Sequence, residues 1–438
     1  MTFPCLHSSA RSLATLDMSS IAIIGTGIAG LGCGYFLRGR HRLTWYEKNH
    51  YIGGHTNTVS VEEDGGSIRI DTGFIVYNET TYPNLTRLFR ELEVETAPSS
   101  MSFSVQHLPS GLEYCGSGLN GLFSQRKNLM NPRFINLLRQ INRFNQQCPE
   151  VLDHPRYAAC TLMEYVQAGS YGEDFIHRYL LPMSSAIWST EPDLMLSFPA
   201  ASLVRFFKNH GLLGLNTHHQ WKTVVNGSWS YRDKLIAPFK DDIHINRAAV
   251  KIFREHGKAV VLDAGGVRAE YDKLIFACHA DQALALLGDP AEDEARILKP
   301  FQYQRNRAAL HTDASVMPRA RRAWSSWNYR LETDRQGNAI PSTVYYMNRL
   351  QPLATARDHF VSINDRGNIA PEKILYEIEY EHPIYSLETM AAQKELPALN
   401  RNGVTWFCGS YFNHGFHEDA LTSALDLCRA LTGEKLWQ

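Results

Sequence analysis

The sequence predicts an α/β protein in which a Rossmann-like dinucleotide-binding domain carries an inserted α+β domain with an antiparallel sheet. Three observations support this prediction. A strand, a glycine-rich turn and a helix follow one another near the N-terminus. The middle of the chain has helical periodicity, and short strand-like runs dominate after Trp221.

Length and composition place the chain among globular proteins. Its 438 residues are enough for two or three domains, and 44% of them are hydrophobic and 20% charged. The net charge of −1 gives no general attraction to nucleic acid, so we expect no nucleic-acid partner. No apolar run is long enough to span a bilayer, which leaves only peripheral membrane contact open.

The cysteines and histidines indicate neither a disulfide framework nor a metal centre. The eight cysteines include no CxxC pair, and the neighbours of His218-His219 lack zinc-like spacing. We therefore expect no metal and a cytoplasmic protein with reduced thiols. Residues 1–17 make a poor signal peptide, and Met18 is an alternative start.

The N-terminal glycines have the spacing of a dinucleotide-binding loop. Gly25, Gly27 and Gly30 follow the apolar run 20–24 and precede a helix expected over 31–37. The first glycine permits a tight turn, the second lets the backbone approach a pyrophosphate, and the third allows close packing of helix on strand. Phosphates are favoured at the start of such a helix, which begins with Ile28 and Ala29.

Glu47 ends the next strand, and an ordinary tight turn does not account for it. Its carboxylate is placed to accept hydrogen bonds from a ribose diol, which favours a dinucleotide with an unphosphorylated adenosine ribose.

A second glycine pair follows in the stretch Glu47-Lys48-Asn49-His50-Tyr51-Ile52-Gly53-Gly54-His55-Thr56. This stretch resembles the flavin-containing amine oxidase superfamily, which includes phytoene-desaturase-like and protoporphyrinogen-oxidase-like enzymes. In that family a Gly-Gly-Arg loop passes the FAD pyrophosphate, and this chain has His55 in place of the arginine, which weakens a charge contact there. The resemblance implies that the cofactor is FAD.

Further matches to the family follow in the expected order. They are Ile70-Asp71-Thr72-Gly73-Phe74, Val225-Asn226-Gly227-Ser228, the strand around Val250, the strand 271–278, Phe407-Cys408-Gly409-Ser410 and His417-Glu418-Asp419-Ala420-Leu421. The resemblance implies that the cofactor contacts Lys48, Gly53, Gly54, His55, Thr56, Thr72, Gly73, Phe74, Val250, Gly409, Ser410, His417, Glu418, Asp419 and Ala420, besides the first loop. Val250 is assigned to the adenine, and Cys408 to a buried thiol rather than a flavin link.

The same resemblance implies a discontinuous FAD-binding domain and an inserted substrate domain. The first comprises 18–80, 222–290 and 402–438; the second comprises a helical part, 81–221, and an antiparallel sheet, 291–401. Helices are expected over 132–148, 162–179 and 200–210, and strands over 307–311, 342–347, 360–363 and 376–380.

More narrowly, His55 and the segments 310–313 and 324–329 resemble a bacterial branch similar to the oxidase-like region of plant cyclopropane-fatty-acid synthases. That branch implies a role in lipid metabolism. The leading interpretation is an FAD-dependent oxidoreductase that oxidises or desaturates an unsaturated or methyl-branched fatty acyl chain by hydride transfer to flavin. Oxidation of a hydrophobic amine is the first alternative, and a non-catalytic FAD- and acyl-binding accessory of a lipid-modifying enzyme is the second.

Residues for the chemistry are less clearly marked. There is no Gly-x-Ser-x-Gly elbow or HExxH helix, which disfavours hydrolysis. The strand position at which classical amine oxidases place a lysine holds Asn306 or Arg307 here. His311, Tyr411 and His414 are the catalytic candidates, each with structural packing as its alternative. Trp324, Trp327 and Tyr329 can line an apolar cavity or pack in the core.

Overall fold

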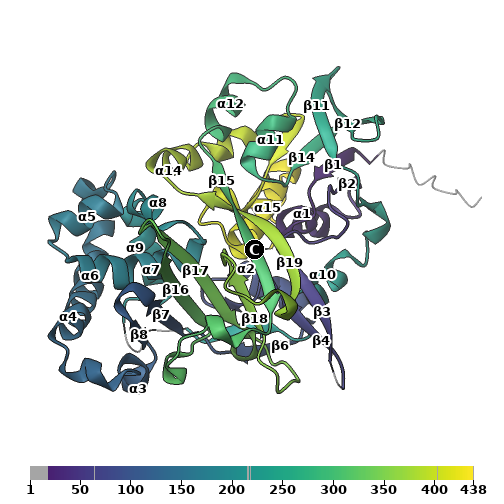
Figure 1. The fold of residues 1–438 in the computed structure, drawn as a ribbon. Coiled ribbons are helices and arrows are strands. Elements are labelled where there is room, and N and C mark those ends of the chain that lie inside the picture. Colours follow the sequence, from purple (N-terminus) through teal and green to yellow (C-terminus); the bar gives the residue numbers. More distant parts are fainter. Residues whose placement is uncertain (1–17, 64, 215–216, 218, 402, 438) are drawn as a thin grey trace, which may run out of the picture.

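The computed structural model describes residues 18–63, 65–214, 217, 219–401 and 403–437. The expectations for residues 1–17 and for His218 therefore lie outside the described residues. Figure 1 shows the strands of the nucleotide-binding region beside a long twisted sheet, with most of the short helices gathered at the far end of that sheet.

A five-stranded parallel sheet forms the nucleotide-binding core, in the order β10-β2-β1-β14-β20. Its strands are β1 (Ser20–Ile24), β2 (Arg42–Tyr46), β10 (Ile243–His244), β14 (Lys273–Phe276) and β20 (Thr405–Phe407). Strands β1 and β14 are almost wholly buried, because helices or further chain cover both faces of a parallel sheet. The Rossmann-like architecture is confirmed; the exact domain boundaries stay a prediction.

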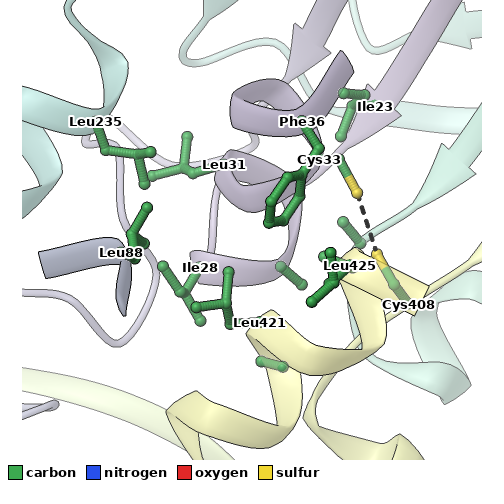
Figure 2. Packing of buried hydrophobic residues seen from close by; sticks show 14 of the residues in the cluster. Ile23, Ile28, Leu31, Cys33, Phe36, Leu88, Leu235, Cys408, Leu421 and Leu425 are labelled. Carbon is green, nitrogen blue, oxygen red and sulfur yellow. Dashed lines mark hydrogen bonds between the residues drawn. The ribbon is translucent and has the colours of Figure 1, made fainter. Parts of the chain in front are cut away.

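Two helices pack on this sheet and on each other: α1 (Ile28–Leu37) and α15 (His417–Thr432). Figure 2 shows Leu421 and Leu425 of α15 beside α1, and the sulfur atoms of Cys33 and Cys408 lie 3.8 Å apart. Glycines let α1 come close, since a Cβ on Gly34 would lie 2.5 Å from the Trp45 ring. Helix α1 begins three residues earlier than predicted.

A seven-stranded sheet forms the second part of the fold, in the order β19-β15-β18-β17-β16-β7-β8. Its strands are β7 (Phe103–His107), β8 (Leu112–Cys115), β15 (Gln302–His311), β16 (Trp327–Thr333), β17 (Ala339–Tyr346), β18 (Phe360–Ile363) and β19 (Ile374–Ile384). All neighbours are antiparallel except β16 and β7, which are parallel. The antiparallel sheet is confirmed, but the segment predicted as helical supplies two of its strands.

The helical part packs around a core of buried aromatic residues at one end of this sheet (Figure 1). Its helices are α2 (Pro83–Glu91), α3 (Gly118–Leu122), α4 (Pro132–Gln147), α5 (Leu162–Ala168), α6 (Glu173–Phe175), α7 (Leu181–Trp188), α8 (Pro192–Leu196) and α9 (Ala200–Asn209). The single helix predicted over 162–179 is wrong. Gly169 ends α5, Ser170 has a φ of +50°, and Gly172 precedes the next turn, so the chain changes direction there.

Shorter strands and helices complete the fold. The strands are β3 (Thr58–Glu63), β4 (Gly66–Asp71), β5 (Tyr77–Asn78), β6 (Thr96–Ser99), β9 (Trp221–Val224), β11 (Ala249–Glu255), β12 (Lys258–Asp263) and β13 (Arg268–Tyr271). The helices are α10 (Trp229–Ile236), α11 (Ala280–Leu286), α12 (Glu292–Leu298), α13 (Met347–Leu350) and α14 (Leu387–Gln393).

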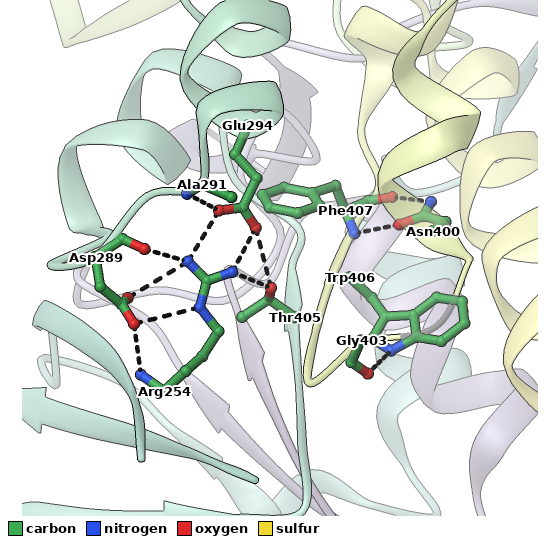
Figure 3. A network of polar contacts seen from close by, with 9 residues as sticks. All are labelled: Arg254, Asp289, Ala291, Glu294, Asn400, Gly403, Thr405, Trp406 and Phe407. Atoms are coloured by element: carbon green, nitrogen blue, oxygen red, sulfur yellow. Dashed lines mark hydrogen bonds and ion pairs between the residues drawn. The ribbon is translucent and has the colours of Figure 1, made fainter. Parts of the chain in front are cut away.

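A polar network ties β11 to α12 and β20 (Figure 3). The guanidinium of Arg254 donates to both carboxylate oxygens of Glu294, at 2.8 and 2.9 Å, and to the carbonyl and carboxylate of Asp289. Glu294 also accepts from the backbone N–H of Ala291 at 2.8 Å and from the Thr405 hydroxyl. Three segments distant in sequence thus share one buried carboxylate.

We expect Glu294→Ala to lower the free energy of unfolding by about 3 kcal/mol, because it leaves the half-buried guanidinium and several donors without their acceptor. Asp293→Ala is the matched control on the same helix. Its carboxylate is exposed and, among the described residues, pairs only with Arg296, so we expect a loss below about 1 kcal/mol. Urea unfolding measures both, and equal losses would contradict the role given to Glu294.

Candidate cofactor and substrate site

A cavity of about 1660 Å³ runs from the parallel sheet to the aromatic core of the helical part. One end lies where β1, β2 and β14 finish, and it is lined by Gly25, Tyr46 and Ala277. Dinucleotides bind outside the carboxyl ends of the strands in open α/β sheets. The cavity therefore begins where the glycine loop predicts a nucleotide.

The first glycine loop has the backbone geometry that the sequence predicted. Gly25 has a φ of +103°, and a Cβ there would lie 2.8 Å from the Ala277 carbonyl oxygen. A Cβ on Gly30 would lie 2.2 Å from the Gly25 carbonyl oxygen, which is the close packing expected of the third glycine. Gly27 differs from both. It lines the cavity, and a Cβ there would meet nothing within 4 Å.

The start of α1 is free to bind an anion. Gly27 is its N-cap, no side chain caps the helix, and no acidic residue lies in its first turn. Ile28 and Ala29 of that turn line the cavity. Unpaired N–H groups and the positive end of the helix dipole therefore face a space that protein atoms do not fill.

The second glycine pair meets the first loop at this point. Gly53 and Gly54 have φ values of +128° and +59°, and both line the cavity. A Cβ on Gly54 would lie 3.4 Å from the Gly27 Cα. The two backbones thus meet without side chains between them, which is the arrangement that a bound pyrophosphate needs.

Glu47 lines the cavity and also braces the glycine loop, a role that the sequence did not reveal. Its carboxylate accepts from the Thr26 N–H at 3.1 Å, from the Thr26 hydroxyl at 2.6 Å and from the Asn49 N–H at 2.8 Å. The side chain is 5% exposed, and Lys48 beside it lines the cavity as well. These bonds hold the carboxylate in place and leave it acceptor capacity for ligand hydroxyls.

His55 stands in the cavity wall with an unused polar atom. Its ring stacks on Tyr380 at 4.8 Å, and its Nε2 is buried without a hydrogen-bond partner in the described chain. Burial lowers the pKa of His55 well below its usual value, so the ring is neutral. A buried nitrogen without a partner, in the wall of a cavity large enough for a cofactor, is suited to form a hydrogen bond with a polar ligand atom.

The segment after β4 lies against His55. A Cβ on Gly73 would lie 2.2 Å from the His55 carbonyl oxygen, so only glycine fits. Thr72, Gly73 and Phe74 line the cavity, and Phe74 stacks on His417 at 3.9 Å. Val250 also lines the cavity.

The C-terminal motif contributes only in part. Gly409, Ser410, His417 and Ala420 line the cavity. The carboxylates of Glu418 and Asp419 serve helix ends instead of lining the cavity, so contact of these two residues with the cofactor stays a prediction. Glu418 accepts from the N–H groups of Asn84 and Leu85, both at 2.9 Å, and Asp419 accepts from the Phe416 N–H at 2.8 Å. Asp419 therefore caps α15, whose N-terminus is less free than that of α1.

Thr56 is another predicted contact, and its hydroxyl is engaged within the protein. Its hydroxyl contacts the Tyr231 hydroxyl and lies 3.1 Å from the His417 Nε2, so it turns into the protein instead of lining the cavity.

The three catalytic candidates separate in the structure. Tyr411 lines the cavity, and its hydroxyl is buried without a partner in the described chain. His311 does not line it: this side chain lies on the other side of the long sheet, 2.8 Å from the Ser362 hydroxyl, and accepts from the Asp313 N–H. His414 packs beside Phe206 instead of facing the cavity.

His382 is the residue at the site that sequence reasoning missed. The strand was expected to end at Tyr380, but β19 continues through Pro383, so the side chain of His382 reaches the cavity. Its Nδ1 lies 2.7 Å from the Asn306 Nδ2, and the Asn306 Oδ1 accepts from Asn364 at 2.7 Å. This arrangement makes Nδ1 an acceptor and puts the ring proton on Nε2. Asn306, one of the two residues at the position of the family lysine, thus orients the ring of His382.

The far part of the cavity is largely apolar and aromatic. It is lined by Met183, Ile187, Trp188, Phe206, Trp221, Trp327, Tyr345 and Phe416. Of the three residues for which the sequence left cavity lining and core packing open, Trp327 lines the cavity, whereas Trp324 and Tyr329 are buried in hydrophobic clusters. None of the helices in the described part of the chain has the length and apolarity that a bilayer crossing requires.

Comparison with known proteins agrees with this geometry. Residues 23–92 match the family described as NAD(P)-binding Rossmann-like domain. Putrescine oxidase bound to putrescine is a similar solved structure, with 13% identity, a TM-score of 0.67, and coverage of 95% of this chain and 99% of that one. No curated protein sequence matches the chain.

Two further structures share the fold. Cyclohexylamine oxidase from Brevibacterium oxydans IH-35A has 15% identity and a TM-score of 0.65, with coverage of 95% of this chain and all of that one. The CLA-producing fatty acid isomerase from P. acnes has 16% identity and a TM-score of 0.63, with coverage of 93% of this chain and 97% of that one. Residues 23–92 thus resemble a Rossmann-like domain, and the chain as a whole has the fold that these three proteins share.

Proposed function

We propose that this protein is an FAD-dependent oxidoreductase that acts on a hydrophobic substrate. The observation that carries the proposal is the meeting of Gly27 and Gly54 at the uncapped start of α1, beside the oriented carboxylate of Glu47. The oxidase names of two proteins with this fold support a redox function.

The residues that would hold FAD follow from their placement. The Gly27 and Gly54 backbones leave room for the pyrophosphate, and the first N–H groups of α1 donate to it. Glu47 accepts from ribose hydroxyls. The unpaired Nε2 of His55 and the hydroxyl of Tyr411 offer polar contacts further along the cavity. When bound, FAD supplies the two-electron acceptor for hydride removed from the substrate.

We propose a fatty acyl chain as the substrate class, to be oxidised or desaturated. The aromatic and aliphatic walls of the far cavity bury apolar surface and exclude water from the reacting carbon. That a fatty acid isomerase shares the fold supports this choice.

A hydrophobic amine is the second candidate, favoured by acidic residues at the wall. Glu379 and Glu381 line the cavity and would attract a cation. Arg305 lies 3.5 Å from Glu379 and 3.8 Å from Glu381, and His279 lies 3.4 Å from Glu381. These neighbours compensate the acidic charge, so we rank the amine below the acyl chain.

Anaerobic bleaching of the bound flavin tests the substrate class. Holoprotein is mixed under anaerobic conditions with unsaturated and methyl-branched fatty acids or with hydrophobic amines, and flavin absorption is followed. Bleaching by acyl chains alone is the expected result, and bleaching by amines alone would replace acyl chains with the second candidate. If neither class bleaches a flavin that dithionite reduces, the protein binds FAD as an accessory without turnover.

We expect His382→Phe to lower kcat/KM about 100-fold, the effect typical of losing one donor that is aimed at developing charge. The variant keeps a ring in the wall but removes the Nε2–H, so flavin content should not change. Asn306→Leu removes the partner that fixes the tautomer and should give a smaller loss. His256→Phe, at an exposed turn, is the control. Unchanged kinetics in His382→Phe would exclude the His382 Nε2–H as a donor to charge that develops during the reaction.

A further inference from the structure

A second pocket, of about 470 Å³, is lined by four arginines from three separate segments. Arg126 begins the turn at 126–130, Arg321 and Arg322 lie in the turn at 321–323, and Arg349 lies on α13. Ser117 and Asn120 complete the polar wall. The pocket belongs to neither the glycine loops nor the aromatic end of the large cavity.

Neutral groups hold two of these guanidiniums in place. Arg126 donates to the Phe123 carbonyl at 3.0 Å and to the Asn120 Oδ1 at 2.9 Å. Arg349 donates to the Trp324 carbonyl at 2.5 Å. Carbonyl and amide oxygens orient a guanidinium without neutralising it, so these two cations keep their full charge.

Arg321 and Arg322 add to the excess of positive charge in the pocket. Arg321 stacks on the Trp324 ring at 4.0 Å and reaches Asp358 only at 3.5 Å. Arg322 is exposed and has no ion-pair or hydrogen-bond partner within the described chain. Four cations thus face one carboxylate. Guanidiniums are the donors best matched to phosphate oxygens, which they bind in pairs of parallel bonds.

Exposed apolar side chains flank the same pocket. Met130 is 92% exposed, Leu119 is 74% exposed and Leu129 is 53% exposed, and these are the three most exposed large hydrophobic side chains in the described chain. All three lie within one turn of Asn120 or Arg126 along the chain. Apolar tips around a cationic centre are the pattern of surfaces that meet the headgroup layer of a membrane.

The arginine pocket adjoins the large cavity. Ser117 lines both, and its neighbours Gly116 and Gly118, together with Phe103, line the large cavity. A lipid whose phosphate lies among the arginines therefore has its apolar part beside this cavity wall. We propose that the arginine pocket binds the phosphate of an anionic phospholipid headgroup and docks the protein on the membrane surface that supplies its hydrophobic substrate.

Vesicle flotation of the holoprotein tests the docking, which does not depend on flavin chemistry. Phosphatidylcholine vesicles are compared with vesicles that also contain phosphatidic acid. We expect binding only to the anionic vesicles and a loss of about 30-fold in Arg126→Gln/Arg322→Gln, since each basic residue at the surface contributes about 1 kcal/mol, or about fivefold. Arg335→Gln/Arg366→Gln removes the same charge from exposed positions elsewhere and should bind within about twofold of the unchanged protein.

Two further arms separate the sources of the phosphate. Leu119→Ser/Met130→Ser should weaken vesicle binding while leaving the arginines intact. Calorimetry with inorganic phosphate tests the free anion: tight, arginine-dependent binding of free phosphate without vesicle binding would overturn the lipid assignment. If the two double arginine variants lost the same amount of vesicle binding, or if the protein bound neutral and anionic vesicles equally, the assignment of the arginine pocket as the binding site would be wrong. Flavin content and thermal unfolding of each variant show that it is folded, so a failure here leaves the oxidoreductase proposal standing.

Discussion

Replacing Gly27 by leucine is expected to abolish retention of FAD while the protein stays folded. Gly27 has a φ of −64° and a ψ of 174°, which any residue adopts, and a Cβ there would meet no atom within 4 Å. The added side chain would instead occupy the space where two glycine backbones meet. We expect FAD affinity to fall about 100-fold or more, which corresponds to about 3 kcal/mol.

Gly403→Leu is the matched control for this substitution. A Cβ at Gly403 has only ordinary contacts, at 3.5 Å and beyond, and the residue lies away from the cavity. Equilibrium dialysis with FAD and urea unfolding of both variants separate binding from stability. Full FAD occupancy in Gly27→Leu would contradict the assignment of the loop.

Acidification is expected to destabilise the protein by several kcal/mol between about pH 6.5 and about pH 4. Burial lowers the pKa of His210, His311, His382 and His414 to about 4 and that of His417 to about 3, from the usual value of 6.5. The unfolded chain takes up these protons at a higher pH than the folded chain does. Stability from neutral histidines is therefore fully present above pH 6.5 and is lost as the pH falls.

Two buried carboxyls act in the opposite direction. Burial raises the pKa of Asp71 to about 6 and that of Asp419 to about 7. Their protonation favours the folded state as the pH falls, but the histidines outnumber them. Urea unfolding at about pH 7 and at about pH 4.5 should show the net loss.

Substitution of one buried histidine tests whether protonation of buried histidines causes the loss of stability in acid. His311→Gln should reduce the loss on acidification by up to about 3 kcal/mol, because its buried ring no longer has to be protonated. His154→Gln changes an exposed histidine and should leave the pH dependence as it was. If both variants respond to acid like the unchanged protein, buried histidines are not the cause.

The elements predicted best are those that a local sequence pattern determines. The first strand, glycine turn and helix, and most strands after Trp221, could be read from continuous apolar runs ended by glycine. Strands β7 and β8 could not, because β7 pairs with β16, more than two hundred residues away, and β8 pairs with β7 at the edge of the sheet. The break after α5 has a local signal, because Gly169 follows that helix and Gly172 precedes the next one.

At the site, backbone roles were predictable and side-chain roles were less so. The glycines of both loops have the conformations that their spacing implied, whereas His311 faces away and His382 faces the cavity. Which face of a strand a residue occupies depends on register and on where the strand ends. Strand β19 continues past the expected end at Tyr380 and includes Pro383, since a proline is tolerated at an edge strand of a sheet. Glu418 and Asp419 had motif positions but cap helices instead.

The most direct test of the central claim is the identity and amount of the nucleotide that the purified protein carries. The visible spectrum is recorded, the protein is denatured with acid, and the released nucleotide is identified by mass spectrometry. The account predicts flavin absorption and one FAD per chain. A protein that carries NAD or NADP, or that shows no flavin absorption and gains none when FAD is added, would contradict it.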